Sequence, residues 1–483
     1  MQLPHAVLLC LFTALVAAVP HKYDEKKNII FMVADGLGLS GITAAREYLQ
    51  VKNNLTYEEA TLEMENYLIG TVRTQSSSNY ITDSAAAGSA FAMGEKTYNG
   101  AISVDPNGVP KGTFYEGAKL LNYTTGIVST TFVQDATICT PNTHVLSRKS
   151  YDLVATQQLG FTHPLGQTMD IVIGGGRQYL HGANSTQYPT KGARKDGVDY
   201  ISKAQEEGWT YMENMDDLYD VWNSTEPQLP LLGLFAAHNI PYEVDRNASE
   251  YPSLTEMSLV ALEQAILATE NTEKGFVLLL EGARIDHAGH ANDPKAHALE
   301  TIAHSDAFMA VLDRVSSLDT ETLVVSTSDH ETGGLGVGYN GIYEWWPENY
   351  INNMTHSAEW VQKKFGEYEG DNKTEVLKEI LVDQCNFSNF TDSDIESLVE
   401  SEDFLVDLAH VFSAAVNLGW TSTAHTQQDV GIYAWSNTEE GYQRLQAAFG
   451  SSIENTEIPH FFAQELGVDL DEITELIKDI DVE

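Results

Sequence analysis

The sequence predicts an α/β fold in which a large, mainly parallel central sheet has helices on both faces and a smaller region inserted at its rim. Apolar, β-branched runs of strand length recur along the chain, and helical segments alternate with them. The composition allows such a fold, because a chain of 483 residues with 42% hydrophobic residues can bury a large core.

The expected strands are apolar along most of their length and do not alternate apolar with polar residues. This pattern is typical of strands that are buried on both faces, as in a parallel sheet between two helical layers. The runs cover residues 28–34, 124–129, 170–173, 275–280 and 322–327.

The clearest expected helix covers residues 253–270, where Ser253 and Glu256 form a capping-box pattern ahead of apolar residues at helical spacing. A second helix is expected over residues 294–310. From about residue 341 to residue 420 the chain becomes helical and acidic and carries four glycosylation sequons. We interpret residues 341–420 as a crown-like insertion at the rim of the sheet and not as an independent domain.

The N-terminus predicts export. Residues 6–16 form a short apolar run followed by small residues that suit cleavage, so residues 1–18 are expected to be a secretory signal peptide. The run is too short to span a membrane, and residues 19–483 are expected to be secreted as one domain without a membrane anchor. Nine Asn-x-Ser/Thr sequons agree with this route: Asn54, Asn122, Asn184, Asn223, Asn247, Asn353, Asn372, Asn386 and Asn389.

The charge of the chain excludes some partners. With 70 acidic and 27 basic residues, the formal net charge is -43. Nucleic acids and anionic membrane surfaces would both be repelled, so we expect neither as a partner. A small anionic substrate would be repelled as well, and its site would therefore have to be locally positive.

Acidic residues and histidines follow three of the expected strands. Because the carboxyl ends of parallel strands meet at one edge of a sheet, we expect these side chains to lie close together. Carboxylates mixed with imidazoles suit Zn²⁺, and an all-oxygen subset suits Mg²⁺. One Asp-Gly after a strand is often only a turn, but three clusters in register favour a metal site. The residues are Asp35, Glu281, Asp286, His287, His290, Asp329 and His330.

A glycine-rich motif offers a competing interpretation. Residues 36–41 spell G-x-G-x-x-G between an expected strand and an expected helix, as in dinucleotide-binding proteins. That motif requires an acidic residue about 20 positions later, at the end of a second strand. Here Glu58 and Glu59 lie in a polar stretch, and Asp35 would face the pyrophosphate. The sequence therefore argues against an NAD-dependent oxidoreductase.

Ser84 stands at the start of a helix of small residues, after Thr82 and Asp83. A serine at this place can cap the helix, or it can be a nucleophile whose alkoxide is stabilised by a metal ion. The residues alone leave both interpretations open.

The chain carries these motifs in order: Asp35-Gly36-x-Gly38, Asp83-Ser84-Ala85, Asp135-Ala136-Thr137, Ser147-Arg148-Lys149, Glu281-Gly282, Asp286, His290, Asp329-His330, His425 and Asp429-Val430. Taken together, they resemble the alkaline phosphatase family along most of the chain. They occur in the order of the family, with thirteen residues from Asp135 to Arg148 and nine from Glu281 to His290. The Glu331-Thr332-Gly333-Gly334 segment after His330 is similar to fungal and animal members.

The resemblance implies a site for two zinc ions and one magnesium ion. The implied ligands of the first zinc are Asp286, His290 and His425. Those of the second zinc are Asp35, Asp329 and His330, beside Ser84. Those of magnesium are Asp35 again, Asp135, Thr137 and Glu281, with His287 nearby but not a ligand.

The resemblance also implies the activity. Residues 19–483 would be one alkaline phosphatase domain that hydrolyses phosphate monoesters through a covalent phosphoserine on Ser84. Arg148 would bind the phosphoryl oxygens, because its planar guanidinium matches them in a bidentate way. The resemblance further implies a homodimer.

Three other functions fit the sequence less well. Sulfatases of the same superfamily use a C-x-P-x-R motif, but the segment starting at Cys139 has Thr143 at the arginine position, and Ser84 already fills the nucleophile position. A phosphodiesterase of the same superfamily is the other less favoured alternative for the main activity. A phosphate- or metal-binding protein without turnover would lack a nucleophile or a ligand, and none is missing.

Whether Cys139 pairs with Cys385 stays open.

Overall fold

The computed structural model describes residues 26–343 and 351–483. The expected signal peptide, residues 1–18, lies outside the described residues, as do residues 344–350 of the expected insertion. Within the described part of the chain, no helix combines the length and the apolar character needed to cross a membrane.

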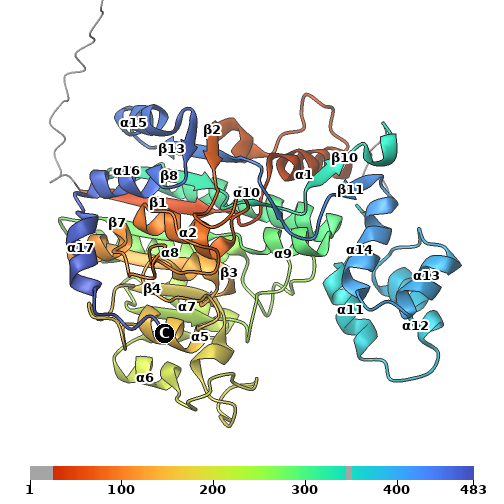
Figure 1. Cartoon of the computed structure of the whole chain (residues 1–483), viewed down its shortest axis with the longest axis horizontal. Coiled ribbons are helices and arrows are strands. Elements are labelled where there is room, and N and C mark those ends of the chain that lie inside the picture. The colour runs from red at the N-terminus through yellow and green to blue at the C-terminus, as the bar shows by residue number, and fades with distance from the viewer. Residues whose placement is uncertain (1–25, 344–350) are drawn as a thin grey trace, which may run out of the picture.

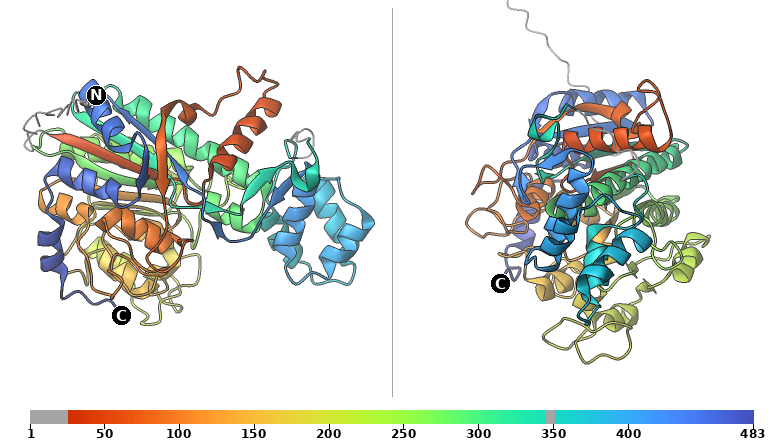
Figure 2. Two further views of the ribbon diagram at one scale, coloured as in Figure 1. Left: turned by 45° about the horizontal axis from the view of Figure 1, so that its top comes forward. Right: turned by 90° about the vertical axis from the view of Figure 1, so that its right-hand side faces the viewer.

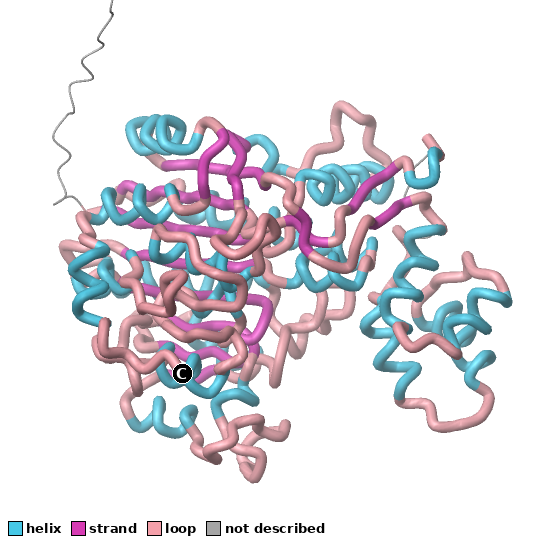
Figure 3. Tube along the Cα trace, in the orientation of Figure 1, coloured by secondary structure: helices cyan, strands magenta, loops and turns pink. Residues whose placement is uncertain are grey.

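The centre of the fold is a ten-stranded sheet in which most neighbouring strands are parallel (Figures 1 and 3). Four central strands run parallel to one another in the order β8 (Glu321–Thr327), β1 (Lys27–Val33), β7 (Phe276–Glu281) and β3 (Thr124–Phe132). Next to β3 follow, also parallel, β4 (Ile171–Gly175), β6 (Leu231–Leu234) and β5 (Thr210–Met212). The predicted α/β fold with a large, mainly parallel sheet is confirmed.

The other edge of the sheet is mixed. Strand β13 (Val430–Ser436) is antiparallel to both of its neighbours, β8 and β2 (Leu68–Arg73), and β14 (Ser452–Glu454) lies parallel to β2 at the edge. All five strands expected from the sequence exist, and each lies within the central or the parallel part of the sheet.

Hydrophobic clusters cover both faces of the sheet. Alternate residues of β1 point to opposite faces, so Ile29 and Phe31 enter one cluster while Ile30 and Met32 enter the other. The first cluster is covered by α2 (Ser84–Met93), α3 (Phe114–Leu120) and α16 (Glu457–Leu466). The second is covered by α8 (Leu254–Thr269) and α10 (Pro294–Val315).

The two expected helices are α8 and α10. Helix α8 begins with the predicted capping box, in which Ser253 Oγ accepts from the Glu256 amide at 3.1 Å and Glu256 Oε2 accepts from the Ser253 amide at 2.8 Å. Helix α10 continues five residues beyond the expected end, because Val311, Leu312 and Val315 carry its buried face onward.

Much of the region interpreted as an insertion forms helices that protrude from one side of the body (Figures 1 and 2). They pack on a hydrophobic cluster of their own that includes Val361, Leu381 and Phe412. The strands β10 (Leu335–Val337) and β11 (Leu418–Trp420) pair near its two ends. The helices are α11 (Ala358–Gly366), α12 (Lys373–Glu379), α13 (Asp392–Val399) and α14 (Phe404–Ala414).

The cysteine question left open by the sequence is answered by the fold. Cys139 ends the short helix α4 (Ala136–Cys139), whereas Cys385 lies in the cluster of the protruding helices. Both thiols are buried and free, so they form no disulfide with each other.

Candidate active site

The residues expected after three strands meet at one edge of the sheet. Asp35 follows β1, Asp329 and His330 follow β8, and Asp286 lies on α9 (Arg284–Ala291), which follows β7. Gly36 makes this close approach possible. Its φ is +81°, and a Cβ added there would stand 2.5 Å from the Asp286 Cα.

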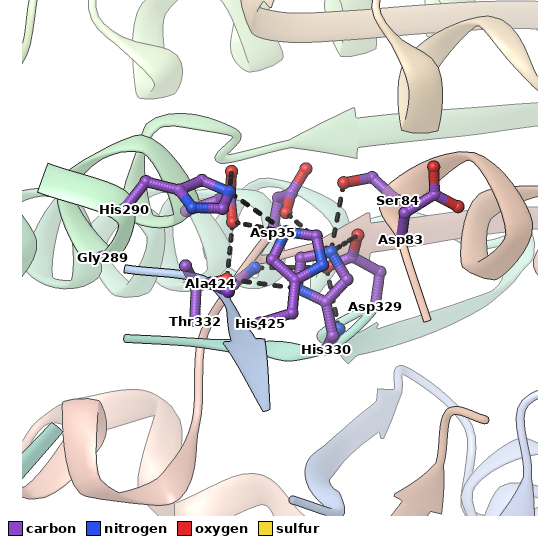
Figure 4. A network of polar contacts seen from close by, with 12 residues as sticks. Asp35, Asp83, Ser84, Gly289, His290, Asp329, His330, Thr332, Ala424 and His425 are labelled. Carbon is purple, nitrogen blue, oxygen red and sulfur yellow. Dashed lines mark hydrogen bonds and ion pairs between the residues drawn. The ribbon is translucent and has the colours of Figure 1, made fainter. Parts of the chain in front are cut away.

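The first group consists of Asp286, His290 and His425. Figure 4 labels the two histidines, which lie side by side. Asp286 and His290 are one helical turn apart on α9, and His425 comes from the short strand β12 (His425–Thr426), which pairs with β9 (Glu331–Thr332). The Nε2 atoms of the two histidines are 3.4 Å from Asp286 Oδ2 and Oδ1, respectively.

The other ring nitrogens in this group fix its chemistry. His290 Nδ1 donates to the Thr423 carbonyl at 2.6 Å, and His425 Nδ1 donates to the Thr82 carbonyl at 2.9 Å. In the neutral rings both Nε2 atoms then carry lone pairs, yet they face each other at 3.1 Å. Two facing lone pairs repel unless a proton or a metal ion lies between them, and backbone carbonyls commonly orient metal-binding histidines in this way. The donor set therefore fits a metal ion.

The second group joins Asp35, Asp329 and His330 to Ser84 (Figure 4). His330 Nε2 lies 3.1 Å from Asp329 Oδ2, 3.8 Å from Asp35 Oδ1 and 3.1 Å from Ser84 Oγ. Among the described residues, the buried Asp35 Oδ1 has no hydrogen-bond partner. A buried carboxylate oxygen without a donor is a poor arrangement for a protein alone and a suitable one for a metal ligand.

Ser84 is the first residue of α2, and Asp83 is the residue that caps this helix. The Asp83 side chain accepts from the Ala86 amide at 3.0 Å. The capping interpretation of Ser84 is therefore wrong, and its hydroxyl is available to His330. Asp83 was not predicted as the cap from the sequence, although an aspartate before a helix is as good a capping residue as serine.

Asp135, Thr137 and Glu281 lie around the second group but are less tightly gathered. Thr137 Oγ1 is 3.5 Å from Asp329 Oδ2, and Glu281 Oε2 accepts from Ser129 Oγ at 2.6 Å. Asp135 caps α4 through the Ala136 amide. No close group of three carboxylates, histidines or cysteines that includes Asp135 or Glu281 occurs in the described ranges. His287 is half-buried, and burial with the nearby charge of Arg284 lowers its pKa to about 4.

Burial, and then the crowding of carboxylates, raises the pKa of two carboxyl groups of the site. Burial, and then the charges of neighbouring carboxylates including Asp329 and Asp286, raise the pKa of Asp35 well above its ordinary value. Burial and the charge of Asp135 raise the pKa of Glu281 in the same way. These shifts show that the charged carboxylates repel one another, and divalent cations would remove that repulsion.

Arg148 brings positive charge to the same place. Its Nη1 lies 3.3 Å from Asp83 Oδ2, and its Nη2 lies 3.2 Å from Asp135 Oδ1. Burial would lower the pKa of Arg148, but the charges of Asp135 and Asp83 outweigh burial and raise that pKa. The guanidinium is therefore permanently charged. It is held between Asp83, which precedes Ser84, and Asp135, which caps α4.

The glycine-rich motif is filled by the protein itself. The Gly36 amide donates to Asp329 Oδ1 at 3.2 Å, and the Leu37 amide donates to Ser328 Oγ at 2.9 Å. A Cβ at Gly38 would stand 2.3 Å from Glu331 Cγ. The amides that would bind a pyrophosphate are therefore engaged, in agreement with the sequence argument against a dinucleotide.

A third buried group was missed by the sequence analysis. Glu116 Oε1 lies 3.0 Å from His144 Nε2 and 2.8 Å from His163 Nε2. The Leu165 amide donates to His163 Nδ1 at 3.2 Å, so the proton of this ring is on Nε2. An Nε2–H cannot bind a metal ion, and this group is better described as a buried hydrogen-bonded network. Its residues come from three separate segments, and no local pattern links them.

Comparison with known proteins agrees with the fold. The family model described as alkaline phosphatase matches residues 26–468. The chain is 41% identical to the repressible alkaline phosphatase of Saccharomyces cerevisiae, over 94% of this chain and 84% of that protein. It is 34% identical to an alkaline phosphatase of Schizosaccharomyces pombe, over the same shares, 94% and 84%. The crystal structure of a cold-active alkaline phosphatase from Shewanella sp. matches with a TM-score of 0.74 and 28% identity, covering 91% of this chain and 99% of that one.

Proposed function

The chain belongs to the alkaline phosphatase family, and on this premise we propose that it hydrolyses phosphate monoesters through a covalent phosphoserine at Ser84. The observation that carries this proposal is the position of the Ser84 hydroxyl. Its Oγ lies 3.1 Å from His330 Nε2, in the group that also contains Asp35 and Asp329.

We assign three cations to the site, as the family is metal-dependent. The proposed ligands of a first zinc are Asp286, His290 and His425, and those of a second zinc are Asp35, Asp329 and His330. The proposed magnesium ligands are Asp35, Asp135, Thr137 and Glu281, with His287 close by. Bound there, the cations would supply Lewis-acid stabilisation to the serine oxygen, the phosphoryl group and the departing oxygen.

The residues of the chain then perform two displacements. Ser84 Oγ forms a bond to phosphorus while the bond from phosphorus to the alcohol oxygen breaks, and the alcohol leaves. Arg148 donates from its two terminal nitrogens to the phosphoryl oxygens and exchanges its contacts with Asp83 and Asp135 for them. Water next attacks the phosphoserine, which releases inorganic phosphate and restores Ser84.

We further propose that residues 1–18 direct secretion and that residues 19–483 form one glycosylated catalytic domain with an insertion over about 341–420. Several sequon asparagines, such as Asn54, Asn184 and Asn372, are exposed, which supports glycan attachment. From the family we also infer a homodimer. Secretion is tested by sequencing the N-terminus of exported protein, and the dimer by light scattering of the eluted enzyme.

The activity is tested with p-nitrophenyl phosphate at about pH 9, where a phosphatase of this family should work best. A chelator should abolish turnover, and Zn²⁺ with Mg²⁺ should restore it. Ser84→Ala should retain metal but lose the labelled phosphoenzyme and most turnover, because it lacks the nucleophile. Ser77→Ala, an exposed serine seven residues earlier, is the matched control. Near-normal turnover by Ser84→Ala would contradict the assignment of the nucleophile.

A further inference from the structure

A cleft of about 480 Å³ opens between the loop that follows β6 and helix α11 of the protruding region. Its volume is within the range of roughly 300–1,000 Å³ that is usual for small-molecule sites. None of its lining residues belongs to the proposed metal or phosphoryl site. Its lining includes His238 and Tyr242 of the loop, Arg284 at the start of α9, and Glu359, Trp360 and Lys363 of α11.

The cleft is lined by both charged and aromatic side chains. The buried Arg284 donates to Glu359 Oε2 at 2.7 Å and to the Ile240 carbonyl at 3.1 Å, and its guanidinium covers the Tyr242 ring at 3.8 Å. Lys363 is exposed, and Trp360 is half-buried. Such a surface suits a ligand that has a flat ring with hydrogen-bonding edges. A long apolar chain would instead desolvate these charges without pairing them.

An aromatic wall connects this cleft to the active site. Its surface is formed by Tyr151, Tyr179 and His238, which pack around the buried ring of Phe132. The Phe132 ring stands 5.4 Å from Tyr151, 5.1 Å from Tyr179 and 4.5 Å from His238, and the two tyrosine rings are 4.8 Å apart. His238 is exposed and lines the cleft, and both tyrosines are half-buried.

The other end of the wall lies beside the phosphoryl site. The Asp135 amide donates to the Phe132 carbonyl at 2.8 Å, and Tyr151 is three residues after Arg148. The charge of Asp135 also adds to the effect of burial in raising the pKa of Tyr151 and of Tyr179. The wall therefore begins at the residues that hold Arg148 and ends in the cleft.

We propose that the aromatic wall and the cleft bind the alcohol part of the substrate, and that they favour esters whose alcohol carries a flat, hydrogen-bonding ring, such as nucleoside 5′-monophosphates. The inference rests on the proposed function, because it takes the phosphoryl group to be at Ser84. With the phosphate beside Arg148, the sugar would follow the wall and the base would lie against His238 and Trp360. An ester with a small alcohol would leave the cleft empty.

The test compares adenosine 5′-monophosphate with glycerol 2-phosphate as substrates of the metal-loaded enzyme. In His238→Ala, the ratio of kcat/KM for the nucleotide to that for glycerol 2-phosphate should fall about tenfold, as expected for the loss of one ring that stacks on a base. The change should be mainly in KM for the nucleotide. Adenosine alone should inhibit the wild type competitively, and this inhibition should weaken to a similar extent in His238→Ala.

Trp360→Leu should change the ratio in the same direction. His460→Ala is the matched control, because His460 is an exposed histidine on α16 and lines neither wall nor cleft, and its ratio should stay within about twofold of wild type. If both esters are hydrolysed and the ratio in His238→Ala equals that of wild type, the cleft does not bind the alcohol. If the metal-loaded wild type hydrolyses neither ester, the proposed function itself is overturned. His238→Ala decides the matter alone if Trp360→Leu does not fold, since His238 is exposed.

Discussion

Arg148 is prepared for an anion by two carboxylates that compete with that anion. Asp83 and Asp135 hold the two terminal nitrogens of the guanidinium at 3.3 and 3.2 Å, so the fork is already oriented before a phosphoryl group arrives. Preorganisation of this kind reduces the entropy that binding would cost. It also means that phosphate gains only the difference between its own hydrogen bonds and those that it displaces.

Arg148→Lys should weaken phosphate binding while keeping the charge. Lysine has one ammonium in place of the planar fork, so we expect a loss of about 1 to 3 kcal/mol, the range for charge-assisted hydrogen bonds. The measurement is the inhibition constant for inorganic phosphate, with metal content checked. Lys149→Ala removes an exposed positive charge one residue away and is the control. An unchanged inhibition constant in Arg148→Lys would remove Arg148 from the phosphate site.

At the scale of single residues, the sequence predicts ligands well where the fold gives them a common edge. Asp35, Asp286 and Asp329 could be placed together because they follow strands that are parallel. His425 could be placed with them only through the family resemblance, since it lies on a two-residue strand whose partner is set by the tertiary structure. The choice between Asp83 and Ser84 as helix cap also needed the structure, because both residue types cap helices equally well.

At the scale of elements, one carboxylate joins three segments on the α3 side of the sheet. Glu116 Oε2 accepts from the Thr113 amide at 2.8 Å to complete the capping box of α3, and Glu116 Oε1 accepts from both His144 and His163. His144 Nδ1 in turn donates to the Ser103 carbonyl at 2.8 Å. Burial alone would raise the pKa of Glu116, but the charge and hydrogen bonds of His144 and His163 outweigh burial and hold it below its ordinary value.

Glu116→Gln should therefore destabilise the fold at neutral pH. Removing one partner of a buried pair typically costs about 3–5 kcal/mol, since the histidines lose the charge that they face. Because the folded pKa of Glu116 is depressed, its stabilisation is complete above the ordinary value of 4.5 and is lost as the pH falls below that value. The difference between wild type and variant should thus shrink on acidification.

The measurement is urea unfolding of both proteins at about pH 7 and at about pH 4, at equal metal content. Glu95→Gln is the control, because Glu95 is exposed and forms a surface ion pair with Lys111 at 2.8 Å. A surface pair contributes at most about 1 kcal/mol. If Glu116→Gln unfolds at the same urea concentration as Glu95→Gln, the network does not fasten the three segments.

Elements with a strong internal pattern were predictable, and short ones were not. The five apolar runs became strands because each is long enough to be buried across the sheet. Strands β5, β6 and β14 have three or four residues, too few to show any period, and they form through pairing with neighbours. Strand β2 is mostly not buried and lacks an apolar run, so only its ladders with β13 and β14 define it.

At the scale of the whole molecule, a strongly acidic chain surrounds a site that must attract a dianion. The net charge is -43, yet Arg148 and the proposed divalent cations together outweigh the five proposed ligand carboxylates. The long-range field and the local field therefore have opposite signs. Composition alone reveals the negative long-range field. The positive local field depends on residues that the fold gathers from distant parts of the chain.

The rate of encounter should report which field governs the approach of substrate. Salt screens charges over about 8 to 10 Å at physiological ionic strength, so it reduces the repulsion from the distant surface more than the attraction within the site. If encounter limits kcat/KM for p-nitrophenyl phosphate, this value should rise with moderate NaCl at constant metal occupancy. Added sucrose establishes the premise, because an encounter-limited kcat/KM falls as viscosity rises. At a lower pH, where the ester is a monoanion, the salt effect should be smaller, since electrostatic steering scales with the charge of the substrate. A fall of kcat/KM with salt would mean that the local positive site, and not the acidic surface, controls approach.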